Sequence, residues 1–600
     1  MAAAISKHSL VFAYLAAVVP ALLMAVSQPV WSVIDEAQHF DFIVQLAHGV
    51  YPIADETLVG ADTLEVMRST GVFGARAGTN PVPDLTDIGP PPPSMSARVN
   101  AAWMLRHKWQ LSHESVQTPV YYLSMVPVWW IADRLGGTFA AIYALRVVNA
   151  LILATLAPMA VVVARTLSPA RSDVAGVAAL FAILLPGMDL NGTRVSNDAL
   201  AAAIGGLIVL LAVRWAGEKW TWRRAALMGV ILGLGLLVKL TLAGLIPALV
   251  LSALWPSAQS RMTSLARATL SLVIAALFLS PWFLVNRQNY GTVMPGAHAA
   301  RLSDSVPGTL TAPFIPFDVA VFHLTYWTGE PWGALPLVVL MSVMGAVIVL
   351  MVPVGVANLL RLRVLGVSRG PLVVAVVATA GLVALSLLLP AIGGFEFAGP
   401  GRYAYPALPA GAVLCAIGLL SVMPNPLAQR TLAAAYAVLA SAMLVGGAAG
   451  LPAMPDAGPR TPPALATLVN VSASGRLDGV TINVDRVALD PAAQAMWFEV
   501  RVSNVGPGEM EWSAVPVASN GGMAVNGEYR MSTQLPGDID VGQAVTGWLM
   551  VRLNPASLAH GEPVRLRFAD VAVDNYARVE VIEVSVNLPL VSSAFLARPA

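Results

Sequence analysis

The sequence predicts a mainly α-helical polytopic membrane protein that ends in an all-β, sandwich-like domain. Hydrophobic residues make up 57% of the 600 residues and charged residues only 12%, and the mean hydropathy is +0.70. Soluble domains carry about twice this share of charged residues. Long apolar segments recur up to residue 451, and runs of alternating apolar and polar residues follow them. Composition and patterning therefore predict a membrane domain followed by strands.

Charge and cysteine content exclude several classes of protein. The formal net charge is +1, which argues against nucleic acid as a partner. Cys415 is the single cysteine, so the chain can build neither a disulfide framework nor a thiolate metal site.

The first apolar segment covers residues 10–30. Lys7 and His8 precede it and small residues lie near Ser27, a pattern that a cleaved signal peptide also shows. We expect a retained helix instead, because the stretch stays apolar to Val30 and reaches membrane-spanning length.

Further apolar segments complete the predicted membrane domain, with about eleven crossings in all. They lie at residues 118–133, 139–164, 174–188, 198–213, 225–255, 264–285, 334–357, 371–390, 404–422 and 430–450. Three of them separate the loop 31–117 from the turn 191–198, although an even number must cross if both lie outside. We therefore expect either 118–133 or 174–188, both short for a span, to lie along the interface or to re-enter.

Basic residues set the predicted orientation, because cytoplasmic loops carry an excess of Lys and Arg. Three basic loops are expected on the cytoplasmic side, containing Arg214, Lys219, Arg223 and Arg224; Arg261 and Arg267; and Arg361, Arg363 and Arg369. The external parts are then the loops 31–117, 286–333 and 391–403, the turn 191–198 and everything after residue 452. This alternation requires that 225–255 is a re-entering pair of short helices broken near Lys239.

Prolines mark a change in the chain after Leu451. They stand at positions 452, 455, 459, 462 and 463 and predict a linker over residues 453–463. Apolar and polar residues then alternate in runs that are separated by Gly, Pro, Asn and Asp, which predicts an external, periplasmic β-sandwich over 464–600. Because this part carries no compact His, Cys or carboxylate cluster, we expect it to pack, dock or present an acceptor rather than to catalyse.

Two acidic residues, Asp35 and Glu36, follow the first apolar segment closely. Acidic side chains are costly in hydrocarbon, so a carboxylate pair at the edge of a first helix is a candidate site. A solvated helix end is the alternative. The pair resembles the Asp-Glu at the start of the first external loop of GT-C-type glycosyltransferases, membrane enzymes that take a sugar from a polyprenyl phosphate. The resemblance implies a GT-C-like membrane domain over residues 1–452.

Other motifs of this family follow in the same order. The end of the first external loop contains His113, Glu114, Gln117, Pro119, Tyr121 and Tyr122 and is similar to the family's His-or-Gln, Pro, Tyr-Tyr signature. Thr118 stands where the family usually has a first proline. Four further stretches resemble family elements: 194–198 its second external acidic site, 233–241 its Gly-rich segment ending in Lys-x-Thr, 278–291 its Pro-Trp, Asn, Tyr-Gly stretch and 401–409 its Gly-Arg-Tyr, Pro element.

Sugar transfer from a lipid phosphate needs a carboxylate that accepts the proton of the attacking hydroxyl. We expect Asp35 to be this general base, with Glu36 orienting it or binding the acceptor. Asp198 is expected to join them and, as resemblance to the metal-using branch implies, to hold Mg²⁺ or Mn²⁺ together with Asp35. No metal-ligand cluster is visible in the sequence, so a site without a metal is an equal alternative.

Cations must stabilise the charge that is left on the phosphate, and Arg402, Arg287 and Lys239 are the candidates. The planar fork of arginine matches phosphate oxygens. For both arginines the alternative is an interfacial anchor that reaches lipid headgroups. Lys239 interrupts an apolar stretch, which demands a partner or a water path, and it is alternatively the turn between two half-helices.

Substrate-binding side chains are predicted at His39, Glu114, Gln117 and Tyr403. A lone loop histidine is alternatively solvated. Further aromatic residues could stack on sugar rings, although aromatic residues at membrane interfaces need no such role: Tyr121, Tyr122, Trp282, Tyr326 and Trp327.

Two functions from different classes remain. The first is an inverting inner-membrane glycosyltransferase that moves a sugar from a polyprenyl-phosphate donor to an envelope glycan, lipid or protein acceptor; inversion follows from the resemblance. The second is a transporter or flippase of a lipid-linked or amphipathic solute. Transporters place ionisable residues near the midplane and often show paired halves. Most charges here lie in predicted external loops, which favours the enzyme.

Overall fold

The computed structural model describes most of the chain. The described residues are 7–28, 30–31, 36–54, 57–70, 112–255, 260–294, 315–329, 335–362, 367–393, 400–423, 425–448, 461–462, 466–490, 495–508, 510–512, 516–520, 523–526, 535, 538–551, 563–573 and 578–588.

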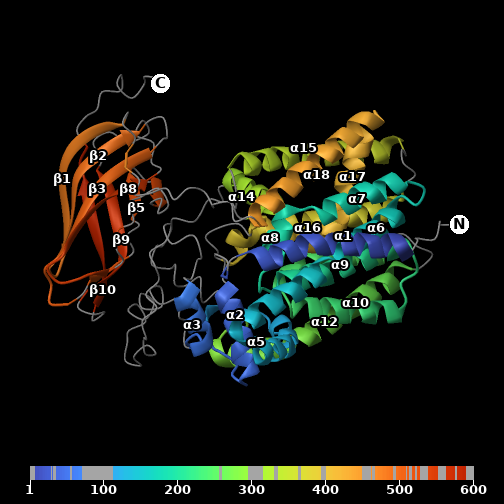
Figure 1. Cartoon of the computed structure of the whole chain (residues 1–600), viewed down its shortest axis with the longest axis horizontal. Helices are drawn as coiled ribbons and strands as arrows, with labels where there is room; N and C mark the ends of the chain where they lie inside the picture. Colours follow the sequence, from blue (N-terminus) through green and yellow to red (C-terminus); the bar gives the residue numbers. More distant parts are fainter. Residues whose placement is uncertain are drawn as a thin grey trace. The chain divides into compact units, whose positions relative to one another are not determined.

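The chain divides into two compact units. The first comprises Met1–Gly74, Ser112–His298 and Ala312–Met454, and the second Ala75–Leu111, Ala299–Thr311 and Pro455–Ala600. Described residues of the first unit are mainly helical and those of the second form strands (Figure 1), which confirms the predicted fold class. The predicted linker 453–463 lies outside the described residues except for 461–462.

The helical unit contains these described elements in chain order: α1 (Lys7–Ser27), α2 (Glu36–Ala47), α3 (Ala61–Thr70), η3 (His113–Val116), α5 (Val120–Leu153), α6 (Leu156–Leu167), α7 (Ser172–Ile183), α8 (Pro186–Gly192), α9 (Asp198–Trp215), α10 (Trp222–Leu236), η4 (Leu240–Leu245), α11 (Ile246–Leu254), α12 (Arg261–Tyr290), α14 (Ile315–Thr328), α15 (Leu335–Leu362), α16 (Arg369–Gly393), η6 (Gly401–Ala407), α17 (Leu408–Val422) and α18 (Pro426–Ala448).

Among the described residues, eight helices are long and apolar enough to cross a membrane, or up to nine if the bent pair α7 and α8 is one span. This is fewer than the eleven or so crossings that the sequence predicts. The two numbers differ because some predicted segments form helices that are too short to span, and two others form one continuous helical stretch. Helix α10 and the apolar stretch 240–254 are each too short to count, and the stretch 120–167 counts once although it is 48 residues long.

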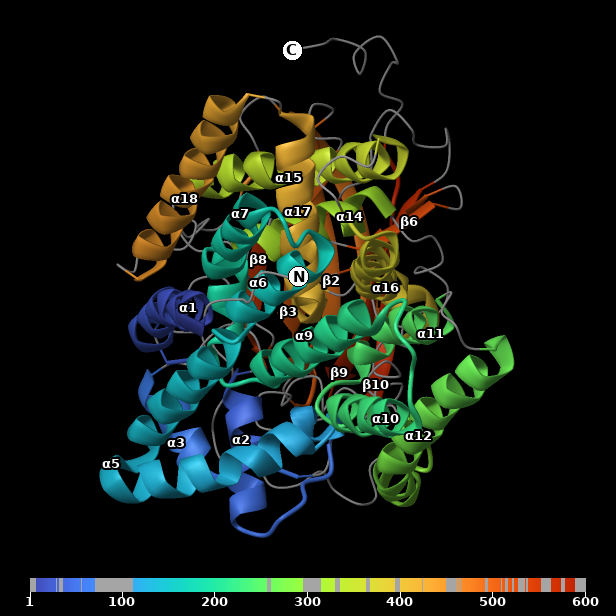
Figure 2. The ribbon, with the colours of Figure 1, turned by 90° about the vertical axis from the view of Figure 1, so that its right-hand side faces the viewer.

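A kink divides α5, and two of the predicted apolar segments meet there. Gly136 and Gly137 have non-helical backbone angles, and Gly137 has a φ of 73°, which favours glycine. In Figure 2, α1 and α16 are seen nearly end on, whereas the light-blue first part of α5 lies across the view. The first part of α5 therefore runs across the bundle, while α7 and α8, over the other short segment, form a pair bent by 45°.

The predicted break near Lys239 is present. Helix α10 ends at Leu236, and Lys239 is extended, with φ −159° and ψ 121°, before η4 begins. A broken helix leaves carbonyl groups without their usual partners. Two are satisfied from other elements: Val120 N donates to Leu237 O at 3.1 Å, and Asn197 Nδ2 donates to Val238 O at 3.1 Å. The starts of α5 and α9 are thus both hydrogen-bonded to the chain between α10 and η4.

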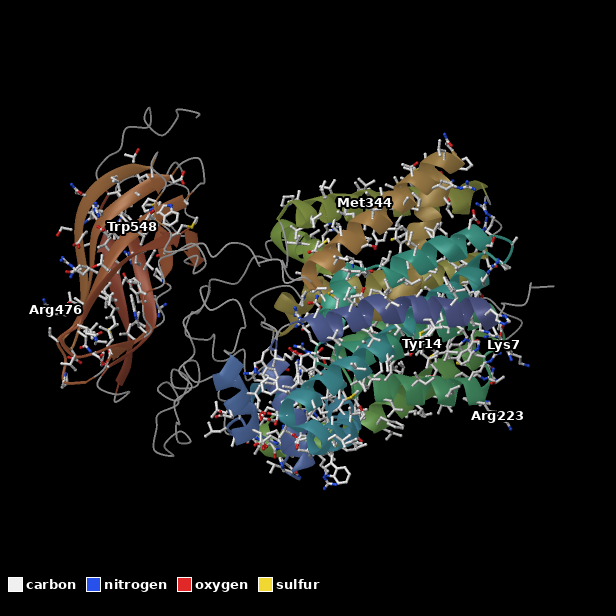
Figure 3. All side chains as sticks on the ribbon, viewed as in Figure 1. Lys7, Tyr14, Arg223, Met344, Arg476 and Trp548 are labelled. Carbon is white, nitrogen blue, oxygen red and sulfur yellow. The ribbon has the colours of Figure 1, made fainter. Side chains whose placement is uncertain are left out.

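The two ends of the helical unit differ in charge. Lys7 and Arg223 lie at one end (Figure 3), while α2, α3 and α8 lie at the end opposite to the N-terminus (Figure 1). The basic loop after α9 is therefore at the far end from α2, as the alternation of loops predicts.

The second unit contains two antiparallel sheets. The strands are β1 (Thr467–Leu477), β2 (Val480–Asp490), β3 (Ala495–Asn504), β4 (Met510–Glu511), β5 (Val517–Asn520), β6 (Met523–Asn526), β7 (Asp538–Ile539), β8 (Ala544–Val551), β9 (Val564–Val573) and β10 (Arg578–Val586). One sheet has the order β1-β2-β3-β8, and the other has the order β6-β5-β9-β4-β7 with β10 paired to β9. Buried residues of both sheets, such as Phe498 and Phe568, form one core.

We expect residues 464–600 to fold without the membrane domain, because the two sheets bury a continuous apolar core between them. The fragment should give a dispersed amide spectrum and a cooperative thermal transition. Within it, Phe498→Ala removes a fully buried side chain and should cost about 3–5 kcal/mol of unfolding free energy. Leu468→Ala, at a side chain that is 56% exposed, is the control and should cost little. A fragment without dispersed amides would show that the strands need the helical unit to fold.

Candidate active site

A cluster of buried charged side chains lies where α2, α5, α9, the break at Lys239 and η6 meet. Its members are Glu36, Arg146, Asp198 and Lys239, each at most 9% exposed, together with Arg402. Buried charges are rare unless they are paired or functional. Four of its members are residues that the sequence singles out for catalysis or phosphate binding: Glu36, Asp198, Lys239 and Arg402.

Glu36, the first residue of α2, forms an ion pair with Arg146 of α5 that is almost completely buried. Arg146 Nε donates to Glu36 Oε1 at 2.8 Å and Nη2 donates to Oε2 at 2.7 Å. The third nitrogen, Nη1, donates to Gln28 O at 2.8 Å. This fork-to-carboxylate geometry is the strong, directional form of an ion pair.

The turn before α9 is held by the same elements. Val195 N donates to Glu36 Oε1 at 2.9 Å. Asn149, one helical turn after Arg146 on α5, donates through Nδ2 to Ser196 O at 3.4 Å and also to Arg194 O. The backbone that leads into Asp198 is therefore fixed by α2 and α5 together.

Asp198 begins α9, where the positive end of the helix dipole favours a carboxylate. Lys239 Nζ donates to Asp198 Oδ1, and Arg402 Nε lies 3.5 Å from Asp198 Oδ2. Lys239 Nζ also donates to Asn197 Oδ1 at 3.2 Å. The side chains of Asp198, Lys239 and Arg402 are 7%, 11% and 15% exposed, so the three charges interact with little screening by water.

Tyr403 lies beside both cations. Lys239 Nζ is 4.7 Å and Arg402 Cζ is 5.8 Å from the centroid of its ring, within the range of cation–π attraction. The predicted element around residues 401–409 thus brings an arginine and an aromatic ring to the carboxylate of the second predicted acidic site.

Close backbone contacts place Arg402. Gly401 N donates to Thr325 Oγ1 of α14 at 2.8 Å. A Cβ at position 401 would lie 2.3 Å from Tyr326 N and 2.4 Å from Phe322 O. Only glycine therefore allows η6 to approach α14 so closely.

Three predicted substrate-binding residues lie close to the charged cluster: His39, Glu114 and Gln117. His39 Nδ1 is 2.7 Å from Tyr122 Oη and 3.6 Å from Glu114 Oε2. Gln117 Oε1 accepts from Asn197 Nδ2 at 3.4 Å. The predicted substrate-binding residues are thus brought to α2 and to the turn before Asp198.

Other predicted residues lie elsewhere. The side chain of Arg287 is exposed near the end of α12, and no contact among the described residues joins it to the cluster. Tyr326 and Trp327 pack in the interior against Tyr405 and Tyr436, an arrangement that needs no sugar. Asp35 lies outside the described residues, as does the side chain of His113.

Asp41 is a buried carboxyl group on α2 away from this cluster. Its Oδ1 accepts from Gly60 N at 2.7 Å. Burial raises the pKa of Asp41 to about 6, although hydrogen bonds from Gly60, Ser112 and Thr63 oppose the rise. Asp41 therefore connects α2 to Gly60, just before α3.

The Mg²⁺ or Mn²⁺ site that the family resemblance implies uses Asp35 and Asp198, and Asp35 lies outside the described residues. Among the described residues, no three His, Cys, Asp or Glu side chains gather as ligands. Asp198 faces the cations Lys239 and Arg402, so a divalent cation at this carboxylate would meet like charges. The metal site stays a prediction.

Arg146 and Asn149 are the residues that sequence reasoning missed. Arg146 is the single charged residue in the apolar segment 139–164. An ionisable residue inside a membrane segment is itself a signal of function, and this signal could have identified Arg146. The contacts of Asn149 with the turn before α9 are visible in the structure alone.

Known proteins were compared with this chain by family model, by sequence and by structure. A family model described as "Predicted membrane protein (DUF2142)" matches residues 19–410. None of the curated proteins matches the sequence.

Among solved structures, the chain is similar to the Archaeoglobus fulgidus oligosaccharyltransferase. The apo form gives a TM-score of 0.41 at 12% identity, over 74% of this chain and 57% of that chain. The form tethered with an acceptor peptide containing the NVT sequon gives 0.40 at 13% identity, over 74% and 56%. The complex with Zn and sulfate gives 0.32 at 14% identity, over 56% and 45%. The chain thus matches little more than half of that protein's length.

Proposed function

We propose that this chain, which belongs to the DUF2142 family of predicted membrane proteins, is an integral membrane glycosyltransferase. It transfers a sugar from a polyprenyl-phosphate donor to an envelope glycan, lipid or protein acceptor on the external face of the bacterial inner membrane. The observation that supports it most is the pair of cations, Lys239 and Arg402, that meets at Asp198 in a nearly dry setting.

These cations suit the phosphate of the donor. Arginine offers five N–H donors in a planar fork that matches phosphate oxygens, and lysine offers three. A phosphate that arrives beside Asp198 can therefore share both side chains. In a site with little water, this charge-assisted binding stabilises the negative charge that develops on the leaving phosphate.

The reaction is a single displacement at the sugar C1. The acceptor oxygen forms a bond to C1 while the bond from C1 to the phosphate oxygen breaks, and the phosphate leaves with that electron pair. Asp35 accepts the proton of the acceptor hydroxyl. Attack opposite to the leaving group inverts C1, as the family resemblance implies. Asp35 precedes Glu36, whose carboxylate is held by Arg146 and Val195, so the general base stands beside an anchored residue.

The remaining predicted residues suit the two substrates. Tyr403 beside the cations can cover the donor sugar, since aromatic rings stack on sugar faces. His39, Glu114 and Gln117 lie on the α2 and η3 side, where they can bind the acceptor.

The orientation follows from basic residues. Lys7 and Arg223 lie at one end of the helical unit (Figure 3), and the positive-inside rule makes that end cytoplasmic. The end that carries α2 is then external, and we propose that the β unit after residue 454 is periplasmic and packs, docks or presents the acceptor.

Mass spectrometry of a deletion strain tests the function. The strain should accumulate one lipid-linked sugar and lack that sugar on an envelope molecule. The purified protein in nanodiscs should then convert the accumulated lipid to polyprenyl phosphate in the presence of the unmodified envelope fraction. Proteoliposomes that move the lipid-linked sugar without breaking its C1 bond would instead establish the transporter or flippase.

Arg402→Lys tests the phosphate site within this assay. The variant keeps a positive charge but loses the fork, so kcat/KM for the donor should fall about tenfold or more, the effect of losing a charge-assisted hydrogen bond. Arg134→Lys is the control, because Arg134 is exposed on α5 and is not a candidate site residue, and it should leave kcat/KM unchanged. Equal rates for Arg402→Lys and the wild type would remove Arg402 from the donor site.

A further inference from the structure

We infer that Arg146 is a positioning residue that holds Glu36, and with it the start of α2, at a set place relative to Asp198. The inference rests on the proposed function, which it deepens. None of the motifs identified in the sequence includes Arg146.

Arg146 joins three parts of the site at once. Its Nε and Nη2 grip both oxygens of Glu36, and Nη1 donates to Gln28 O just after α1. All three guanidinium nitrogens thus have partners on the chain that precedes and begins α2. An arginine used in this way leaves little rotational freedom to the carboxylate that it holds.

The burial of the Arg146–Glu36 ion pair indicates that the pair fixes the position of Glu36 rather than adding to the stability of the fold. The side chains of Arg146 and Glu36 are 1% and 0% exposed. Burying two charges is costly, and hydrophobic residues of similar size often stabilise a fold at least as well. A pair buried this deeply beside other functional charges is therefore better explained by the geometry that it imposes.

The same helix also sets the position of Asp198. Glu36 Oε1 accepts from Val195 N at 2.9 Å, and Asn149 of α5 binds the carbonyl groups of Arg194 and Ser196. Asp198 follows this turn directly. Arg146 and Asn149 therefore make α5 the common support of Glu36 and of the turn that leads into Asp198, whose carboxylate meets Lys239 and Arg402.

Glu36 accordingly has a holding role. Its Oε1 accepts from both Arg146 and Val195, and its Oε2 accepts from Arg146. With both oxygens engaged, Glu36 is poorly placed to accept a proton from substrate, which leaves that step to Asp35.

The kinetic test compares Arg146→Lys and Glu36→Gln with the wild type in nanodiscs. Both variants should lower kcat by about 10- to 100-fold, the effect of a misplacement of about 1 Å, while KM for the donor stays within about twofold. The pH profile of kcat should keep its acid limb, since Asp35 is intact. The double variant should be no slower than the slower single variant, because both remove one interaction. Arg134→Lys, an exposed position on the same helix, is the control and should be neutral.

A measurement without substrate separates this inference from the proposed function. Amide hydrogen exchange should rise in peptides that cover α2 and residues 193–197 in Arg146→Lys and in Glu36→Gln, and should not change in Arg134→Lys. If exchange rises while the wild type transfers no sugar, the positioning stands and the proposed function fails. Unchanged exchange, or full kcat in a variant of equal monodispersity, would overturn the positioning role.

Discussion

Replacing Asp198 by asparagine should stop sugar transfer and destabilise the helical unit. The carboxylate is the shared partner of Lys239 and Arg402, and its loss leaves two cations facing each other with little water. Removing one member of a buried pair costs about 3–5 kcal/mol. Without the carboxylate, Lys239 and Arg402 repel each other and move apart. They can then no longer stabilise the charge on the leaving phosphate together, so kcat should fall by about 10²-fold or more.

Melting and turnover of purified Asp198→Asn in nanodiscs measure the two effects. Asp173→Asn is the control, because its ion pair with Arg171 is largely exposed and should be worth less than about 1 kcal/mol. Adding Lys239→Met to Asp198→Asn should recover part of the lost stability by removing one cation, without recovering activity. A stable, active Asp198→Asn protein would mean that the two cations do not depend on Asp198.

Asp35→Asn should lower turnover by about 10²-fold or more, the usual contribution of general base catalysis. Asparagine keeps the shape of the side chain but cannot accept the proton. The effect should fall on kcat at saturating donor, and it should exceed that of Glu36→Gln, because Glu36 holds rather than transfers. Asp62→Asn, at an exposed residue of α3, is the control.

The comparison requires equal amounts of folded protein, since a carboxylate at the start of a helix also affects packing. Monodisperse Asp35→Asn that glycosylates at the wild-type rate would remove the general base from the proposed mechanism.

Much of the fold follows from the sequence, because apolar length and alternation are local properties. Helices and strands appear where segments of each kind are expected, and the break at Lys239 is visible as one charge in an apolar stretch. The number of membrane spans is harder to predict, because hydropathy shows that a helix is apolar but not in which direction it runs relative to the other helices. The glycine kink at 136–137 turns one apolar stretch across the bundle, and only tertiary packing determines that turn.

The candidate site is predictable in part. Asp198, Lys239 and Arg402 lie far apart in the chain, and the motifs that carry them indicate that they belong together. Arg287 belongs to a motif of the same kind and yet is exposed on α12, since a motif does not state which face of a helix it occupies. Arg146 carries a signal of its own, but its partner Glu36 is 110 residues away, and no spacing rule connects them.

The backbone of η6 touches Tyr326 and Phe322 at Gly401 with no room for a methyl group. The segment that carries Arg402 is therefore packed directly against α14 before any ligand binds. In the proposed mechanism the donor phosphate comes to a segment that is already in place, so that its binding costs little entropy of ordering the protein backbone.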